Sequence, residues 1–266
     1  MALNAIRAAY DPWPLRKQRT QELGARYDFA AEVLIFYAAL LEVQARAFHA
    51  AQANPPAREE LPAYVAASVL PDVVDVTVNA GPRLLADGTV ELFASADLEA
   101  MIGVWLEGEE QSPVATYLAR ASTGPVLEAL APSSRESSAS ERDERHCPSC
   151  GGLPQLAFFG VSDDALLTPP RRLLCARCGT TWIFQRMTCA GCGEQDTSRL
   201  PIYQEGERFP HLRVDGCLTC RRYLITVDCR KDTRAIPIVD ELAAIPLDLY
   251  ARDQGLTKIT ANLLGF

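Results

Sequence analysis

The chain has 266 residues, 48% of them apolar, and a formal net charge of −8. Because a chain of this length and apolar content can bury a sizeable core, the composition excludes a wholly disordered protein and indicates a globular one. Residues 1–19 carry charges and prolines where a secretory leader needs an apolar run of roughly 7 to 15 residues, so we expect no export signal. Phe29 to Leu41 is the most apolar stretch, but it contains Glu32 and is shorter than the roughly 20 residues that span a bilayer. We therefore expect a buried helix there, no membrane insertion and a cytoplasmic protein.

Helical patterns dominate the first half of the chain. One amphipathic helix is predicted from about Thr20 to Gln52, and Pro55 with Pro56 ends it. Its apolar side chains recur at steps of three and four residues: Phe29, Val33, Phe36, Tyr37, Leu40 and Leu41. A second helical pattern follows, and its apolar residues are Tyr64, Val65, Val69 and Leu70. Where this helix ends stays open, because Pro71 and the β-branched run Val73–Val78 come next.

Two further helices are marked by capping residues. Ser95 is the predicted N-cap of a helix that ends at Gly108, and Ser112 with Pro113 opens another. The apolar positions of these helices are Leu98, Ile102, Leu106, Leu118 and Leu130. The first half is thus predicted to be a helical bundle.

Between the two halves lies Pro132–Arg145, which reads PSSRESSASERDER. It is rich in serine and charge and has almost no large apolar side chains, so we expect a solvated linker and a domain boundary. Charge divides in the same way: residues 1–145 have 12 Lys and Arg against 21 Asp and Glu, whereas residues 146–266 have 14 against 13. The acidity belongs to the helical half.

Eight of the nine cysteines form four Cys-x-x-Cys pairs, which are Cys147/Cys150, Cys175/Cys178, Cys189/Cys192 and Cys217/Cys220. The first two pairs enclose 24 residues and so do the last two, so the sequence repeats as two C-x2-C-x24-C-x2-C units. In a reducing cytosol, ordered Cys pairs more often bind metal or act catalytically than form disulfides. Two such pairs supply the four thiolates of a tetrahedral site. Glycine follows three of the pairs, where the turn often needs a positive φ, and β-prone runs, TTWIF and RYLITV, follow the second pair of each unit.

Other arrangements of these cysteines stay open. A thioredoxin-like redox pair is a single Cys-x-x-Cys that opens a helix in a βαβ pattern, which four repeated pairs match poorly. The inner pairs could share one ion, or the pairs could interleave, but the equal loops favour sequential pairing. Four thiolates suit zinc or a single iron in geometry, so the sequence leaves the metal open. Cys229 is expected to be a buried structural thiol, and His146 and His211 to be surface residues.

The chain lacks the signals of an enzyme. No glycine-rich phosphate loop follows a strand, no H-E-x-x-H is present, and three histidines leave little for acid and base chemistry. A four-thiolate site is closed and offers a substrate no open position, so it braces a fold or, with iron, transfers one electron. We therefore expect a binding or chaperone protein that is not an enzyme.

Residues 146–266 contain HCPSCGGLP, LLCARCGTTW, CAGCG and DGCLTCRRYLITVD, followed by AIPIVDELAAIPLDLYARDQGLTKITANLLGF. In this combination of motifs the chain resembles the FdhE family of formate dehydrogenase accessory proteins. The resemblance implies a cytoplasmic maturation factor that binds the molybdenum or tungsten catalytic subunit of formate dehydrogenase before twin-arginine export, without oxidising formate itself. It also implies two rubredoxin-like modules with iron as the favoured metal and zinc as the alternative. By position, Cys147, Cys150, Cys175 and Cys178 would form the first site, and Cys189, Cys192, Cys217 and Cys220 the second.

The expected fold class is α+β, with an N-terminal helical domain, two tandem rubredoxin-like or zinc-ribbon metal modules and a C-terminal helical segment. The expected boundaries are 1–131 for the helical domain, 132–145 for the linker, 146–186 and 187–232 for the modules, and 233–266 for the segment that packs on them.

The C-terminal segment carries three acidic residues of interest. Its apolar residues Leu242, Ile245, Leu249 and Tyr250 have nearly helical spacing, which favours a helix on the modules with Asp240, Glu241 and Asp248 merely solvated. A sharper hypothesis is that these carboxylates present a negative surface to a partner with basic residues, such as a twin-arginine leader.

Two rival functions belong to other classes. Ribbon modules often bind nucleic acid, and five basic residues cluster at Arg221, Arg222, Arg230, Lys231 and Arg234. The near-neutral second half lacks the strongly positive field that phosphate binding needs, so no nucleic acid is expected. The other rival is rubredoxin-like electron transfer, in which both modules hold iron.

Overall fold

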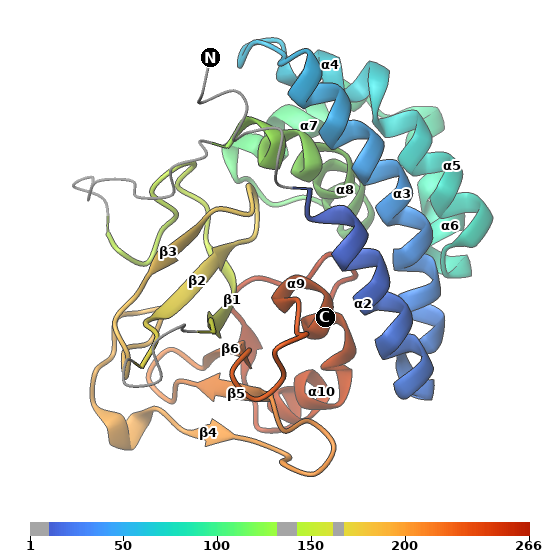
Figure 1. Cartoon of the computed structure of the whole chain (residues 1–266). Coiled ribbons are helices and arrows are strands. Elements are labelled where there is room, and N and C mark those ends of the chain that lie inside the picture. Colours follow the sequence, from blue (N-terminus) through green and yellow to red (C-terminus); the bar gives the residue numbers. More distant parts are fainter. Residues whose placement is uncertain (1–10, 132–142, 162–167) are drawn as a thin grey trace, which may run out of the picture. The chain divides into compact units, whose positions relative to one another are not determined.

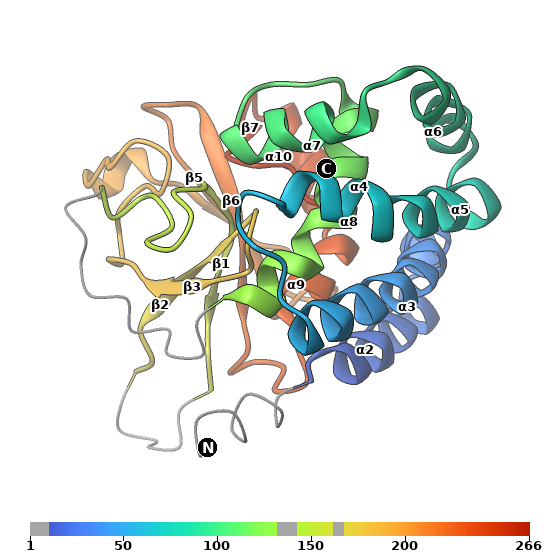
Figure 2. The same cartoon turned by 90° about the horizontal axis from the view of Figure 1, so that it is seen from above.

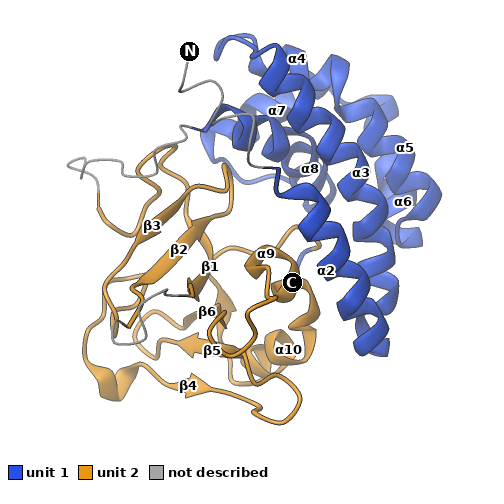
Figure 3. Ribbon diagram, viewed as in Figure 1, with its two compact units in different colours: residues 1–133, 265 blue, residues 134–264, 266 orange. Residues whose placement is uncertain are grey.

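A computed structural model describes residues 11–131, 143–161 and 168–266. The chain forms two compact units, residues 1–133 and residues 134–264, with the last two residues divided between them (Figure 3). The division falls at the start of the serine-rich segment 132–145, of which 132–142 lie outside the described residues.

The first unit is helical, as the sequence predicts. Its central helix is α3, which packs against α2, α5 and α8, and Figures 1 and 2 both show α2 and α3 side by side. Its core includes Leu34, Leu40, Val73, Ile102 and Leu118, all at most 1% exposed. The helices are α2 Trp13–Arg26, α3 Ala31–Ala53, α4 Leu61–Ser68, α5 Leu70–Ala80, α6 Arg83–Ser95, α7 Leu98–Glu107 and α8 Pro113–Leu130.

The prediction of one helix from Thr20 to Gln52 is wrong. α2 ends at Arg26 and α3 begins at Ala31, with a 3-10 turn between them. Tyr27 leaves the helical region with φ −124° and ψ 89°, and its side chain is only 4% exposed. No side-chain cap, proline or glycine marks this reversal, so the helical periodicity runs through it unchanged.

The second helical pattern is also two helices, which meet at Val69. Pro71 stands in the first turn of α5, where its missing N–H costs nothing. The β-branched run that follows is helical because Val73 and Val74 bury against neighbouring helices. Among the described residues, no single helix is long and apolar enough to cross a membrane, and α4 with α5 would pass only as a pair bent by 43°.

The capping predictions are partly confirmed. Ser112 accepts from the backbone N–H of Ala115 at 3.3 Å and opens α8, and Gly108 closes α7 with φ 88°. Ser95 instead ends α6, a helix that the sequence did not predict. The N-cap of α7 is Asp97, whose carboxylate accepts from the N–H of Ala100 at 3.0 Å.

We expect Asp97→Ala to lower the free energy of unfolding of the first unit by about 1 kcal/mol, because the N-terminal N–H groups of α7 lose their acceptor. Ser95→Ala is the matched control and should cost less, since the Ser95 hydroxyl only bonds the Glu91 carbonyl on an exposed surface. Urea denaturation measures both. Equal losses from the two variants would contradict the assignment of the cap.

In its described residues, the second unit is built on one seven-stranded sheet. Its path is β3-β2-β1-β6-β5-β4, and β7 pairs with β6. The strands are β1 Pro154–Phe159, β2 Arg171–Cys175, β3 Thr181–Ile183, β4 Ile202–Tyr203, β5 Leu212–Gly216, β6 Arg222–Asp228 and β7 Thr257–Lys258. The two β-prone runs of the sequence are thus confirmed as β3 and β6.

The two repeats are joined through the middle of this sheet. Within each repeat the strands pair antiparallel, but β1 of the first lies parallel to β6 of the second, with Leu156 opposite Ile225. Figure 2 shows the resulting sheet from above. The expected boundary between residues 186 and 187 therefore cuts through a continuous sheet, and neither repeat is self-contained.

The C-terminal segment packs on this sheet as two short helices, α9 Pro237–Asp240 and α10 Ile245–Asp253 (Figure 1). Prolines at the start of each helix interrupt the predicted single helix and shift its buried face. α10 buries Leu247, Asp248 and Ala251, whereas Leu249 and Tyr250 are 49% and 45% exposed. The predicted apolar face is therefore only partly correct.

Candidate metal centres

The first cysteine cluster is formed by two tight turns. The turn at Cys147–Gly151 precedes β1, and the turn at Cys175–Gly179 connects β2 with β3. In each, the glycine N–H bonds the carbonyl of the first cysteine, and the glycine φ is 73° or 67°. This left-handed conformation is why glycine follows the second cysteine.

The four sulfur atoms of this cluster face one another. Cys147 Sγ lies 3.6 Å from Cys178 Sγ, and Cys150 Sγ lies 3.4 Å from Cys175 Sγ. Metal–sulfur bonds of about 2.3 Å give a tetrahedron with edges of about 3.8 Å, whereas a disulfide bond is about 2.05 Å long. The arrangement fits a tetrahedral ion and is too open for disulfides.

The second cluster repeats this geometry. Cys189 Sγ lies 3.7 Å from Cys220 Sγ, and Cys192 Sγ lies 3.7 Å from Cys217 Sγ. Within each cluster all four sulfurs lie within 4.8 Å of one another. The pairs therefore gather in sequential order, and the interleaved and shared arrangements are not formed. Two ions could be held, each with four thiolates and no open position.

One turn of the second cluster departs from the pattern. Arg221 follows Cys220 where the other three turns have glycine, and it holds φ 57°. A non-glycine residue in this region costs roughly 1 kcal/mol or more. Its guanidinium donates to the carbonyl of Gln254 at 2.9 Å, and its own carbonyl accepts from Thr257 N–H at 2.9 Å. These contacts hold the turn against β7. The sequence predicted neither the contacts nor this strand.

The two clusters differ in exposure. In the first, only Cys150 is half-buried, while in the second both Cys192 and Cys220 are half-buried. Cys229 belongs to neither cluster. It is 7% exposed, as predicted, and burial raises the pKa of its thiol to about 11.

The last residues of the expected linker are fixed in the second unit. Arg145 donates to the carbonyl of Gly191 at 3.2 Å in the second cluster and pairs with Asp143, whose pKa it lowers to about 2. The indole N–H of Trp182 on β3 donates to the carbonyl of Glu144 at 2.8 Å. Residues 143–145 thus connect the two repeats and are not a linker.

The proposed acidic surface is contradicted. Asp240, Glu241 and Asp248 are all fully buried, so they present no charge to a partner and are not solvated either. His211, expected at the surface, is 2% exposed, and its Nε2 lies 2.8 Å from Asp240. His146 is half-buried. Each of these carboxylates meets a polar group in the interior, which comes from β1, β6, β7 or the loop before β5.

Lys258 of β7 is the charged partner of two of these carboxylates. Its Nζ lies 2.7 Å from Glu241 and 3.1 Å from Asp248, and the lysine side chain is 5% exposed. Tyr223 on β6 donates to Asp248 at 2.8 Å, and Gln155 on β1 donates to Glu241. Burial raises the pKa of Glu241, and Lys258 opposes part of that rise.

Comparison with known proteins finds relatives for part of this chain. Residues 187–264 match the family described as FdhE, C-terminal domain. An FdhE homolog of Aquifex aeolicus is 31% identical over 46% of this chain and 42% of that protein, and one of Haemophilus influenzae is 31% identical over 44% and 37%. The chain thus covers about two fifths of the length of these curated relatives.

The crystal structure of the FdhE protein from Pseudomonas aeruginosa superimposes with a TM-score of 0.67 at 20% identity. The match covers 95% of this chain and 94% of the other, and it shows a shared fold. A match of this extent takes in most of both the helical unit and the sheet. By these comparisons residues 187–264 are similar to the C-terminal domain of FdhE, and the chain shares the fold of the FdhE protein from Pseudomonas aeruginosa.

Proposed function

We propose that this protein is a cytoplasmic accessory factor for the maturation of formate dehydrogenase. It binds the catalytic subunit before export and does not itself oxidise formate. The match of residues 187–264 to the FdhE C-terminal domain and the similarity to FdhE homologs support this role. The observation that carries the proposal is the pair of closed four-cysteine sites in one sheet, because they make a rigid surface for a partner without a position for a substrate.

Each site would hold its ion through four thiolates: Cys147, Cys150, Cys175 and Cys178 in the first, and Cys189, Cys192, Cys217 and Cys220 in the second. The resemblance favours iron, which would add one-electron chemistry to bracing, and zinc would brace alone. The half-buried position of the residues Cys192 and Cys220 also supports electron transfer as a second candidate function. A visible spectrum of anaerobically purified protein distinguishes the metals, since ferric thiolate is red and zinc is colourless.

We expect the full chain to co-purify with the catalytic subunit of formate dehydrogenase, expressed with or without its twin-arginine leader. The control bait is an unrelated exported protein with its own twin-arginine leader. Retention of the subunit but not of the control supports the proposal. Failure to retain the subunit in either form, or retention of nucleic acid instead, would reject it.

A further inference from the structure

Helix α6 of the first unit buries little of its own surface. It packs against α5 and α8, and of its thirteen residues only Thr89 is buried. Figure 2 shows it at the outer end of the helical unit, next to α5. A Cβ at Gly88 would lie 3.0 Å from Cγ2 of Val114 on α8, so glycine allows this close approach. The helix thus turns small residues towards its neighbours and leaves larger ones outside.

The outer surface of α6 carries large apolar side chains. Leu84, Val90 and Phe93 are 89%, 53% and 37% exposed. Val90 and Phe93 are three residues apart, so they lie next to each other on the helix surface. Single apolar side chains at a surface are ordinary, but three on one short helix form a patch of the kind that marks an interaction site. The side of α6 that faces solvent is therefore partly apolar.

Two carboxylates are set among these apolar side chains. Asp87 and Glu91 are four residues apart and share one face of the helix. At 3.6 residues per turn, that face lies between Leu84 and Val90. Asp87 pairs with Arg83 at 3.7 Å, but both side chains are well exposed, so the pair neutralises little of the charge. The outer face of α6 thus combines apolar and negative groups.

The acidity of the chain is concentrated around this helix. Residues 69–112 carry nine Asp and Glu and a single Arg, whereas residues 1–68 carry seven residues of each sign. All nine carboxylates are exposed. Among the described residues, only Arg46 and Arg83 form ion pairs with any of them. The nine are Asp72, Asp75, Asp87, Glu91, Asp97, Glu99, Glu107, Glu109 and Glu110.

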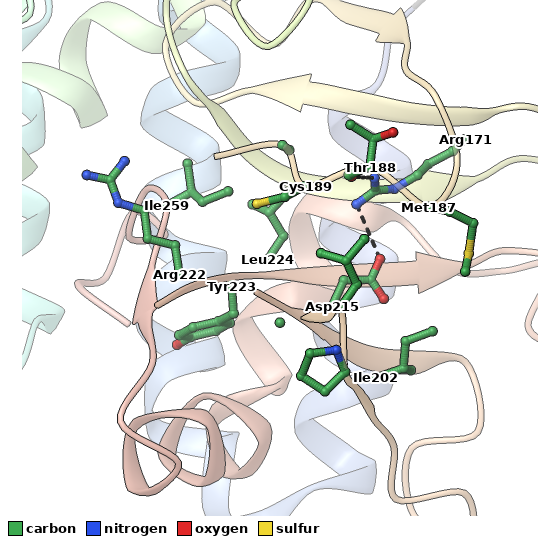
Figure 4. A pocket seen from close by; sticks show the side chains of 14 residues that line it. Arg171, Met187, Thr188, Cys189, Ile202, Asp215, Arg222, Tyr223, Leu224 and Ile259 are labelled. Atoms are coloured by element: carbon green, nitrogen blue, oxygen red, sulfur yellow. Dashed lines mark hydrogen bonds and ion pairs between the residues drawn. The ribbon is translucent and has the colours of Figure 1, made fainter. Parts of the chain in front are cut away.

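The second unit has no such excess. Residues 146–266 have 14 Lys and Arg against 13 Asp and Glu. The hollow beside its second cysteine cluster is lined by Arg171, Arg222 and Asp215, and Arg171 pairs with Asp215 (Figure 4). A basic partner is therefore drawn to the region of α6. A second copy of this chain or an anionic lipid surface would meet like charges there and be repelled.

We propose that α6 docks the leader of the exported catalytic subunit, in which arginines precede an apolar run. A leader joins positive and apolar side chains in one short stretch, and the outer face of α6 complements both. An apolar run of roughly 7 to 15 residues is about 10 to 22 Å long as a helix, and α6 is about 20 Å long. The run covers Val90 and Phe93, and the arginines meet Asp87 and Glu91.

This inference rests on the proposed function, since the catalytic subunit is the partner named there. It places the acidic surface on the first unit, whereas the carboxylates that the sequence suggested for this role are buried in the second.

A fluorescently labelled synthetic peptide with the sequence of that leader tests the proposal against the purified full chain. Val90→Gln combined with Phe93→Gln removes the apolar patch and should weaken binding of the peptide at least about tenfold. Both side chains are exposed, so this variant should keep its helix content, metal content and thermal stability. The matched control is Ile35→Gln on α3, which is 68% exposed. It should bind the peptide within about twofold of the original chain.

The charge contribution is tested separately. Glu91→Lys should weaken binding of the peptide about tenfold at low salt and less at high salt, because salt screens exposed charges. The control Glu59→Lys makes the same change at an exposed carboxylate before α4 and should have a smaller effect. A peptide with its arginines replaced by glutamine should bind the original chain and Glu91→Lys equally weakly.

Retention of the catalytic subunit separates this inference from the proposed function. If the original chain retains the subunit but the α6 variants bind the leader peptide as the original does, the docking site is wrong and the proposed function stands. If the subunit is retained in neither form, the proposed function itself fails. If the α6 variants lose the subunit that lacks its leader, the face binds the mature subunit and the leader is the wrong occupant. A dimer that Val90→Gln with Phe93→Gln dissociates would assign the face to a second copy of the chain instead.

Discussion

Replacement of Cys175 by serine is expected to lower the metal content of the purified protein from about two ions per chain to about one. Cys175 ends β2, is 1% exposed and lies 3.4 Å from the sulfur of Cys150. A structural tetrathiolate ion contributes on the order of 10 kcal/mol to folding, so losing one ligand removes most of that contribution at the first site. Elemental analysis of the intact protein and urea denaturation measure the two effects.

Cys229→Ser is the matched control, because Cys229 is a buried cysteine outside both clusters. It should keep about two ions per chain and lose only about 1–2 kcal/mol of stability, the cost of a polar atom in a small apolar site. If both variants retained two ions, or if the original chain held none while its thiols stayed free, the assignment of the clusters as metal centres would be wrong.

The turns that carry the cysteines could be predicted from the sequence, but the sheet that joins the two clusters could not. Two residues between cysteines, with a glycine after three of the four pairs, indicate tight turns whatever the rest of the chain does, and the equal loops favour sequential pairing of these turns. The pairing of Leu156 with Ile225 brings together residues from different repeats, and no local pattern encodes that partner. The same limit hid the contact of Arg145 with Gly191.

The buried carboxylates were misjudged for a related reason. Asp240, Glu241 and Asp248 stand in an amphipathic stretch, where acidic residues are usually exposed. Their partners His211, Gln155, Tyr223 and Lys258 come from three strands and a loop, some of them far away in sequence. Only the folded sheet shows that each carboxylate meets a polar group.

Lys258→Met should therefore be among the most destabilising single substitutions in the second unit, with an expected loss of about 3–5 kcal/mol. It leaves Glu241 and Asp248 buried without the cation that lies within 2.7 and 3.1 Å of them. Urea denaturation of the full chain measures the loss. The control Lys231→Met changes an exposed lysine of the same unit and should cost less than about 0.5 kcal/mol.

The pH dependence of this loss identifies its cause. Burial already raises the pKa of Glu241, and removing Lys258 takes away the charge that lowers it, so the pKa rises further. The folded variant then keeps a proton that the unfolded chain releases above its ordinary pKa of about 4.3, so stability falls as pH rises through this interval. We expect the deficit of Lys258→Met to be larger at about pH 8 than at about pH 5, where protonation relieves the buried charge.

The added substitution Glu241→Gln should remove much of that difference, because an amide of the same shape needs no counter-charge. A deficit that is independent of pH and unchanged by Glu241→Gln would mean that Lys258 stabilises the sheet through packing of its aliphatic chain instead.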